Sequence, residues 1–325
     1  MKNAILLNCT STYSHVGCYL TISGLKKLLI ECDVNIIHEH EVNNYDFSFV
    51  LRLLESNKDI MLIINGEGTI HDDQDYAKAL LDIASDYNQR TLLLNSQLRN
   101  MSPKYVDIIN NLKFAQVRTK FDHDWCKENG ISDIVYCPDM LFYSGLLPTL
   151  SIASERVLYS DSHDDRASNE LFNCYVNSDK FKTWVNMHYS PVGTHVNQIK
   201  RAILKILSKF FSKRFGYRKE NYYAQANLSN ILQNFCMSKA IVTGRYHGAC
   251  LAIALGKPLL YSYSNTSKIK DLCRDFEYGV ELNASSIIND DSISKQALNI
   301  DNDKIKKYLN LHYINLKRKI LDIVK

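Results

Sequence analysis

Residues 239–258, KAIVTGRYHGACLAIALGKP, constrain the fold more than any other part of the chain. The short apolar run 240–242 predicts a buried strand, and the small and aliphatic residues 248–255 predict a helix. Gly256 is placed to end that helix, and a second apolar run, 259–263, predicts another strand. A strand that passes through a glycine turn into a helix, and then into a further strand, is the repeating unit of a parallel α/β sheet.

Arg245 and His247 stand where the first of these strands passes into the helix. Open α/β folds bind ligands at the carboxyl ends of their strands, and the first backbone N–H groups of a helix favour an anion. An arginine fork fits a carboxylate or phosphate, and a histidine can exchange a proton near neutral pH. We therefore expect both residues to contact a ligand. The alternative is that Gly248 and the following alanines only permit close packing of the helix on the sheet.

The alternation of strands and helices continues along the chain and indicates two α/β domains. A chain of 325 residues exceeds one ordinary core, and domains of about 150 residues are typical. We expect a first domain over 1–145, a second over 155–303 and a final helix over 304–325, long enough to pack back across the seam between them. The expected strands lie at 4–7, 34–37, 59–64, 91–94, 114–117, 134–137, 156–159, 181–188, 240–242 and 259–263.

Composition excludes several classes of function. A net charge of +4 permits an acidic ligand without indicating nucleic acid. Nine scattered cysteines with no CxxC pair indicate a reducing cytosol and predict no metal site. The chain enters a strand at once and has no apolar run near 18 residues, so we expect a cytoplasmic protein with no membrane-spanning segment. The first strand is followed by NCTSTYSHVG, not by the GxGxxG turn of NAD-binding folds.

Residues 198–219, QIKRAILKILSKFFSKRFGYRK, depart from the general pattern because they carry eight basic side chains and no acidic one. A basic amphipathic helix with aromatic residues can lie on an anionic membrane surface. The alternative is a helix that packs on the core and exposes its basic face to solvent. The first interpretation would place the protein at the inner face of the cell membrane.

With these motifs assembled, the chain resembles the polysaccharide pyruvyl transferase family. Residues 244–269 match that family's Arg-x-His, small-residue helix, Gly-x-Pro and Lys-Ile pattern, and shorter matches lie at 65–69, 117–119 and 137–139. The resemblance implies a GT-B-like fold of two Rossmann-like domains that face a cleft. It also implies transfer of a pyruvyl group from phosphoenolpyruvate to a sugar of a cell-surface glycan, such as a capsule or lipopolysaccharide, or of a lipid-linked glycan precursor. No cofactor is expected beyond this co-substrate.

Three positions differ from the family's pattern. The first loop often carries Asn-x-Gly-Asp in the family, but here residues 14–18 read SHVGC and contain no acid. The glycine-rich turn has Glu67 where glycine is usual. The first strand of the second domain often ends in an arginine that helps to hold phosphoenolpyruvate, whereas here it contains Asp161, and the nearest arginine is Arg166.

The residues that the resemblance implies for the donor surround the 239–258 stretch. Arg245, Lys268 and the helix amides near Gly244 and Gly248 would hold the donor anion, while His247 would be a general acid or a phosphate contact. A second clamp is expected from Arg118, which could equally form a local salt bridge.

Two further residues are candidates for deprotonating the attacking hydroxyl. Glu67 follows a buried strand, and it is either that base or the cap of the next helix. His15 is an alternative base or a contact of the acceptor.

Two other classes of function remain open. A glycosyltransferase that uses an activated sugar would employ the same residues, because a fold does not decide the chemistry. A non-catalytic sugar-binding or scaffold protein would tolerate the changes Glu67→Gln and His247→Ala. The sequence carries no indication of the oligomeric state.

Overall fold

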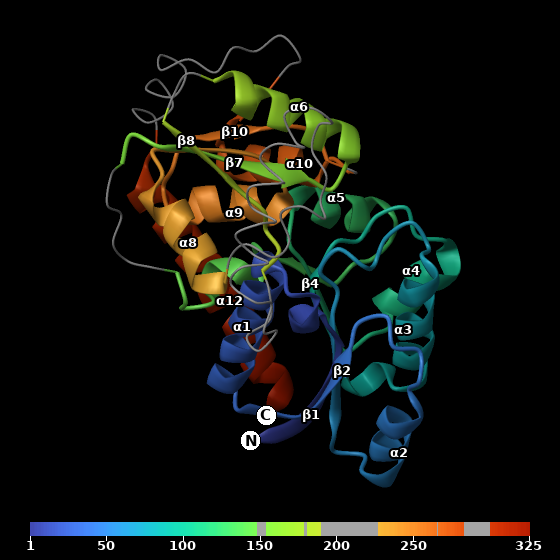
Figure 1. Cartoon of the computed structure of the whole chain (residues 1–325). Helices are drawn as coiled ribbons and strands as arrows, with labels where there is room; N and C mark the ends of the chain where they lie inside the picture. Colours follow the sequence, from blue (N-terminus) through green and yellow to red (C-terminus); the bar gives the residue numbers. More distant parts are fainter. Residues whose placement is uncertain (148–153, 179–180, 190–226, 265, 283–299) are drawn as a thin grey trace, which may run out of the picture. The chain divides into compact units, whose positions relative to one another are not determined.

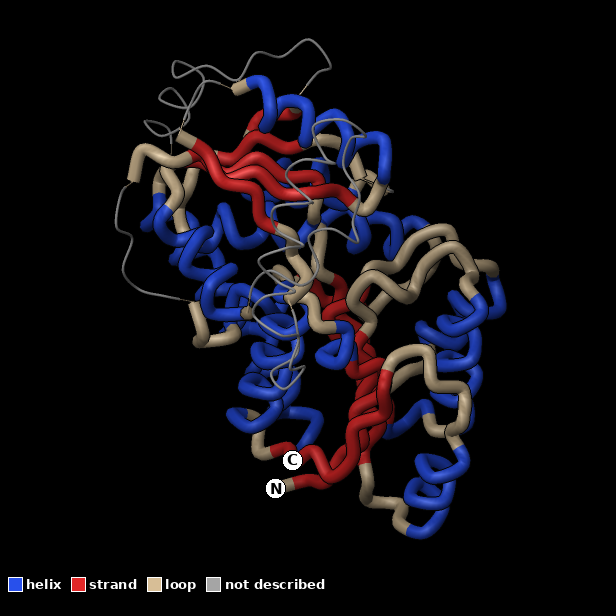
Figure 2. The backbone as a smooth tube through the Cα atoms, viewed as in Figure 1, coloured by secondary structure: helices blue, strands red, loops and turns tan. Residues whose placement is uncertain are grey.

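The protein is described from a computed structural model, over residues 1–147, 154–178, 181–189, 227–264, 266–282 and 300–325. The chain divides into two compact units, which are described separately. Unit 1 contains residues 1–12, 19–145 and 306–325, and unit 2 contains residues 13–18 and 146–305. In both units strands form one layer and helices cover it (Figure 2).

Unit 1 is built on a parallel six-stranded sheet in the order β2-β1-β3-β4-β5-β6. Its central strands are almost entirely buried and read as continuous apolar runs, as expected for a parallel sheet covered on both faces. The strands are β1 (Lys2–Cys9), β2 (Val34–Glu41), β3 (Met61–Asn65), β4 (Thr91–Ser96), β5 (Phe114–Val117) and β6 (Ile134–Tyr136).

Alternate side chains of β1 point to opposite faces of this sheet and so divide its core in two. Ile5 and Leu7 pack with α2 (Ser48–Ser56), α3 (Asp75–Asp86), α4 (Pro103–Asn110) and α5 (Lys120–Glu128). Ala4 and Leu6 pack with α1 (Val16–Glu31) and α12 (Asn302–Val324), and Figure 1 shows these two helices on the face opposite α2, α3 and α4. Short 3-10 turns lie at Thr10–Tyr13, Asn88–Arg90 and Met140–Tyr143.

Unit 2 is built on a parallel five-stranded sheet in the order β11-β10-β9-β7-β8. Its described helices lie on both faces, with α6 on one and α8 and α9 on the other (Figure 1). The strands are β7 (Val157–Ser162), β8 (Lys182–Val185), β9 (Ala240–Gly244), β10 (Leu259–Tyr261) and β11 (Val280–Glu281). The helices are α6 (Asp165–Asn177), α8 (Leu228–Met237), α9 (Tyr246–Ala254) and α10 (Lys268–Phe276).

The expectation of two parallel α/β sheets is confirmed. Gly256 ends α9 as predicted: its φ is +62°, and the next amide, of Lys257, donates to the Ala252 carbonyl at 2.9 Å. The predicted strand 181–188 is too long, because only Lys182–Val185 pair with β7. Strand β11 was not predicted, since a two-residue strand shows no periodicity.

Two predicted segments lie wholly or partly outside the described residues. Residues 198–219, which we expected to form a basic helix, lie outside the described residues, as does much of the predicted linker 143–154. No helix in the described part of the chain is both long and apolar enough to cross a membrane. The facing of the two sheets across a cleft stays a prediction.

Candidate active site

The junction between β9 and α9 is shaped by glycines that allow close packing. A Cβ at Gly244 would lie 2.4 Å from the Ser162 Cβ, and one at Gly248 would lie 2.5 Å from the Thr243 Oγ1. Any larger residue would therefore push helix and strands apart. Both glycines are thus needed for close packing, which was our alternative to a ligand role at this junction. Their contact with a donor stays a prediction.

Arg245 lies at the end of β9 as the N-cap residue of α9, buried in unit 2. Its backbone N–H donates to the Thr243 Oγ1 at 3.0 Å, which fixes the turn. Its guanidinium donates to the carboxylate of Asp161, a fully buried residue of β7. The arginine that we expected to hold a donor anion is therefore already held by a carboxylate. The other carboxylate oxygen of Asp161, Oδ1, has no hydrogen-bond partner among the described residues.

A second segment of unit 2 brings His15 to this region. The Val16 amide donates to the Met187 carbonyl at 2.8 Å, and the Tyr189 amide donates to the Ser14 carbonyl at 2.8 Å. This antiparallel bridge sets the His15 and His188 rings edge to face, with centroids 4.8 Å apart. Residues 171–175 positions apart in the sequence are thus held together by backbone hydrogen bonds.

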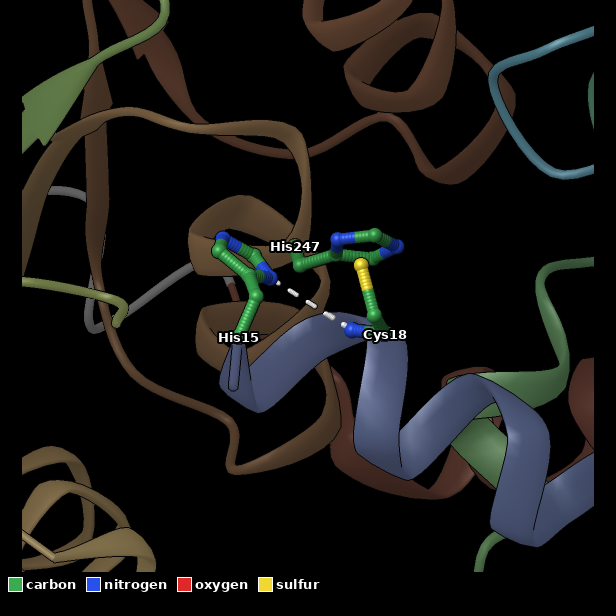
Figure 3. A group of neighbouring side chains, drawn as sticks. All are labelled: His15, Cys18 and His247. Atoms are coloured by element: carbon green, nitrogen blue, oxygen red, sulfur yellow. Dashed lines mark hydrogen bonds between the residues drawn. The ribbon is translucent and has the colours of Figure 1, made fainter. Parts of the chain in front are cut away.

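His15, Cys18 and His247 form one buried cluster, which we call the His-Cys-His cluster (Figure 3). One ring nitrogen of each histidine and the Cys18 sulfur lie within 4.8 Å of one another, and the His15 and His247 ring centroids are 5.6 Å apart. The contact depends on Gly17, because a Cβ there would lie only 2.1 Å from the His247 Cγ. The glycine allows the imidazole to rest directly on the first turn of α1.

Burial and nearby positive charge control the ionisation of His15. Desolvation lowers the pKa of its imidazole well below the usual value, and repulsion by His247, His188, Arg245 and Lys268 lowers the pKa further. Lys268, the first residue of α10, is half-buried. The His15 ring is consequently neutral at pH 7, and its surroundings favour an anion.

Glu67 belongs to unit 1, where it follows β3 with a φ of +34°. Its buried carboxylate accepts hydrogen bonds from the Thr10 hydroxyl at 2.5 Å and from the Asn65 amide at 3.2 Å. The prediction that it caps the next helix is wrong, because α3 begins at Asp75 with Gln74 as its N-cap residue. The glycines on either side leave room for the turn, and the role of Glu67 as a base stays a prediction.

Arg118 also belongs to unit 1, at the end of β5, and is almost fully buried. It donates to the Asp139 carboxylate at 2.9 Å and to the Gln97 side-chain oxygen at 3.2 Å. Asp139 accepts a further bond from the Thr21 hydroxyl at 3.0 Å. Of our two alternatives for this residue, the structure contains the local salt bridge, and a second donor clamp stays a prediction.

Four of the predicted site residues thus gather in unit 2 around the end of β9: Arg245, His247, His15 and Lys268. Sequence reasoning did not single out Asp161 as the partner of Arg245, nor Cys18 and His188 as neighbours of His15. The one available signal was the short spacing of His15 and Cys18, which lie three residues apart across the start of α1 at Val16.

The polysaccharide pyruvyl transferase family model matches residues 15–266, more than half of the chain. The chain belongs to this family. The match includes the His-Cys-His cluster, Asp161 and the complete β9–α9 junction. The sequence matches no functionally curated protein.

Solved structures related to this family member share its fold. The Anabaena Alr3699/HepE protein in complex with UDP-glucose is 12% identical with a TM-score of 0.55, over 99% of each chain. The UDP-GlcNAc 2-epimerase of Methanocaldococcus jannaschii, in complex with UDP-GlcNAc and UDP, is 12% identical with a TM-score of 0.55, over 95% of this chain and 93% of that chain. The lipopolysaccharide outer core galactosyltransferase WaaB is 13% identical with a TM-score of 0.50, over 99% of each chain. These are GT-B proteins, and at such identities the likeness concerns the fold alone.

Proposed function

We propose that this transferase moves a pyruvyl group from phosphoenolpyruvate to a sugar of a surface glycan or of its lipid-linked precursor. The observation that carries the proposal is the gathering of Arg245, Lys268 and two buried imidazoles around the N-terminus of α9, within the segment that matches the family. A helix N-terminus flanked by cations attracts an anion, and phosphoenolpyruvate carries both a phosphate and a carboxylate.

The reaction requires charge stabilisation and proton transfer. The neighbour of the donor's methylene carbon forms bonds to two sugar oxygens, whose hydroxyls lose two protons, and its C–O bond to phosphate breaks. One proton is gained by the methylene carbon and the other by the leaving phosphate, so the products are a ketal and inorganic phosphate. We assign the donor's phosphate and carboxylate to the α9 amides, Lys268 and the outer edge of Arg245. His247, in the first turn of α9, is assigned to protonate the methylene. His15 is assigned to accept a hydroxyl proton.

Asp161 limits how Arg245 can take part. A guanidinium has five N–H donors in one plane, so one edge can hold Asp161 while another faces the donor. The buried carboxylate fixes the orientation of Arg245 and cancels part of its charge. Arg245 is thus assigned to orienting the donor, and Lys268 and the α9 amides are assigned the larger share of its negative charge.

A GT-B glycosyltransferase for the same class of glycan is the second candidate, and Asp161 is the observation that favours it. Where the family often has a donor-binding arginine, this chain has an acid that neutralises Arg245. A donor with a single diphosphate or phosphate group needs fewer cations than phosphoenolpyruvate does. The α9 N-terminus and Lys268 would then hold that group.

Ligand-dependent thermal unfolding distinguishes the two donors. The purified protein is heated alone, with phosphoenolpyruvate, and with sugar nucleotides or sugar phosphates. A ligand at about 100 times its Kd stabilises by roughly 2.7 kcal/mol. We expect a rise in Tm with phosphoenolpyruvate that is lost in Lys268→Ala and kept in Lys270→Ala, an exposed lysine two residues further along α10. A rise only with sugar nucleotides or sugar phosphates would refute the pyruvyl donor and support the glycosyltransferase.

A further inference from the structure

The His-Cys-His cluster has the composition of a transition-metal site. One thiol and two imidazoles come from two segments more than 200 residues apart, and their ligand atoms lie within 4.8 Å of one another. All three residues are at least nine-tenths buried, with exposed fractions of 8–9%. Figure 3 shows the Cys18 sulfur against the His247 ring, with the His15 ring turned toward both. Such side chains are the preferred ligands of zinc and of similar divalent ions.

We propose that His15, Cys18 and His247 bind one Zn²⁺-class divalent ion through two imidazole nitrogens and a thiolate. Three protein ligands leave the fourth tetrahedral position to water or to an anion oxygen, which is the arrangement of exchangeable and catalytic zinc sites. The cysteine spacing in the sequence predicts no zinc site because it contains no CxxC pair. The ligands here instead converge through the bridge between residues 14–16 and 187–189.

The ligand atoms of the cluster are somewhat farther apart than the ligands of a bound zinc ion. Zinc binds nitrogen at about 2.0–2.1 Å and sulfur at about 2.3 Å, so tetrahedral ligand atoms are separated by roughly 3.3–3.6 Å. The most widely separated pair of ligand atoms must therefore approach by up to about 1.5 Å through rotation of the side chains. The Cys18 amide donates to the His15 Nδ1 at 3.4 Å, a long bond whose loss on coordination costs little.

The Cys18 thiolate favours a bound cation, whereas the positive charge of Lys268 opposes it. The cation nearest to the cluster in sequence, Arg245, is paired with Asp161, and the Cys18 thiolate would offset half of the ion's charge. Lys268 adds a positive charge, which together with the ion would draw an anion oxygen to the fourth position. His188 packs edge to face on His15, and its own Nδ1 lies 3.2 Å from the Asn186 Oδ1. This ring contact and the backbone bridge at His15 hold its imidazole in place.

The site uses His247, to which we assigned proton transfer. An imidazole nitrogen that coordinates a metal cannot deliver a proton, so the two roles exclude each other at any one time. If the proposed function holds, zinc is expected to inhibit pyruvyl transfer, and a chelator is expected to restore it. Metal binding itself does not depend on the identity of the donor.

The test is a metal titration of the full chain, prepared without a histidine tag and stripped with a chelator. Zn²⁺ is followed by calorimetry, and Co²⁺ by the thiolate-to-cobalt charge-transfer absorption, which reports a sulfur ligand directly. We expect one ion per chain, and affinity weakened at least about tenfold in Cys18→Ser and in His247→Asn. The matched control is His38→Asn, which removes one member of the His38–His40 pair on β2, with ring centroids 6.1 Å apart. That variant should bind as the parent does.

A second measurement covers the case in which a variant fails to fold. In the unchanged protein, saturating Zn²⁺ should slow alkylation of Cys18, read by mass spectrometry, by at least about tenfold, because a coordinated thiolate is a poor nucleophile. The proposal is refuted if Cys18 reacts equally fast with and without zinc, or if binding persists in Cys18→Ser and is lost in His38→Asn. Because Cys18 is not assigned to the donor, Cys18→Ser should keep its Tm rise with phosphoenolpyruvate, so failure of the metal site and failure of the donor are separable.

Discussion

The buried Arg245–Asp161 pair offers the sharpest test of how this site is held and what it binds. Replacement of Asp161 by asparagine keeps the shape of the side chain and leaves the Arg245 charge without its carboxylate. Removal of one partner from a buried ion pair typically costs 3–5 kcal/mol, because the other charge stays desolvated. The asparagine oxygen can still accept a hydrogen bond, so we expect the lower end, about 3 kcal/mol.

This loss is large enough to measure by thermal unfolding. For a unit of roughly 150–250 residues, each kcal/mol shifts Tm by about 2–4 °C, so Asp161→Asn should melt about 6–12 °C lower than the parent. The assay is a melt followed by circular dichroism in a buffer without phosphate. A matched control replaces both partners, Arg245→Met with Asp161→Leu, and should recover most of the stability, because an apolar pair leaves no buried charge.

An anion should reverse part of the effect if Arg245 faces the donor. Phosphoenolpyruvate at about 100 times its Kd contributes roughly 2.7 kcal/mol, close to the loss itself. Its stabilising effect should therefore be larger in Asp161→Asn than in the parent, where the carboxylate competes for the guanidinium. Two results would refute the reasoning: a Tm within 2 °C of the parent, or an equal phosphoenolpyruvate shift in both proteins.

Three further predictions concern other parts of the chain. Gly17→Ala should lower both kcat/KM, by about 10²-fold, and Tm, because the new Cβ would lie 2.1 Å from the His247 Cγ and 2.3 Å from its Cβ, so that the ring and its backbone must both shift. Gly24→Ala, whose new Cβ meets the Met140 carbonyl oxygen, should lower Tm and leave kcat/KM unchanged. Arg118→Leu should cost about 3–5 kcal/mol in chemical denaturation and leave the Kd of the donor unchanged, and a weakened donor affinity would show that Arg118 is a clamp. Burial raises the pKa of the Cys126 thiol to about 12, so at pH 8 its alkylation should be on the order of 10³-fold slower than that of an exposed thiol and rise tenfold per pH unit; fast labelling at pH 8 would contradict this.

The sequence alone was sufficient to predict the strand, turn and helix of the β9–α9 junction. An apolar run, a glycine, an arginine and a run of small residues specify a strand, a turn and a helix, because each of these depends on neighbours within a few positions. Gly256 at the helix end is a local rule of the same kind, since only glycine adopts a positive φ without cost. The two parallel sheets followed from the repeated alternation of such units.

The partners of the site residues could not be found in this way. Asp161 interrupts no periodic pattern, and its contact with Arg245 exists only because β7 and β9 are neighbours in the sheet. Strand order is set by packing between distant segments, so the sequence predicted an arginine ready for an anion where the fold contains an ion pair. Glu67 is a similar case, because its partner Thr10 lies on a different loop.

The His-Cys-His cluster shows most clearly what the sequence determines and what only the tertiary structure determines. The sequence determined the chemical groups and the glycine between them, and it placed His15 in the first loop, three residues before Cys18. Only the tertiary structure decided that His247 rests on Gly17, and that the bridge between His15 and His188 holds the first loop in unit 2. The physical reason is that a contact between residues 15 and 247 is specified by the packing of whole elements, whereas a helix, a turn or a cap is specified by its own residues.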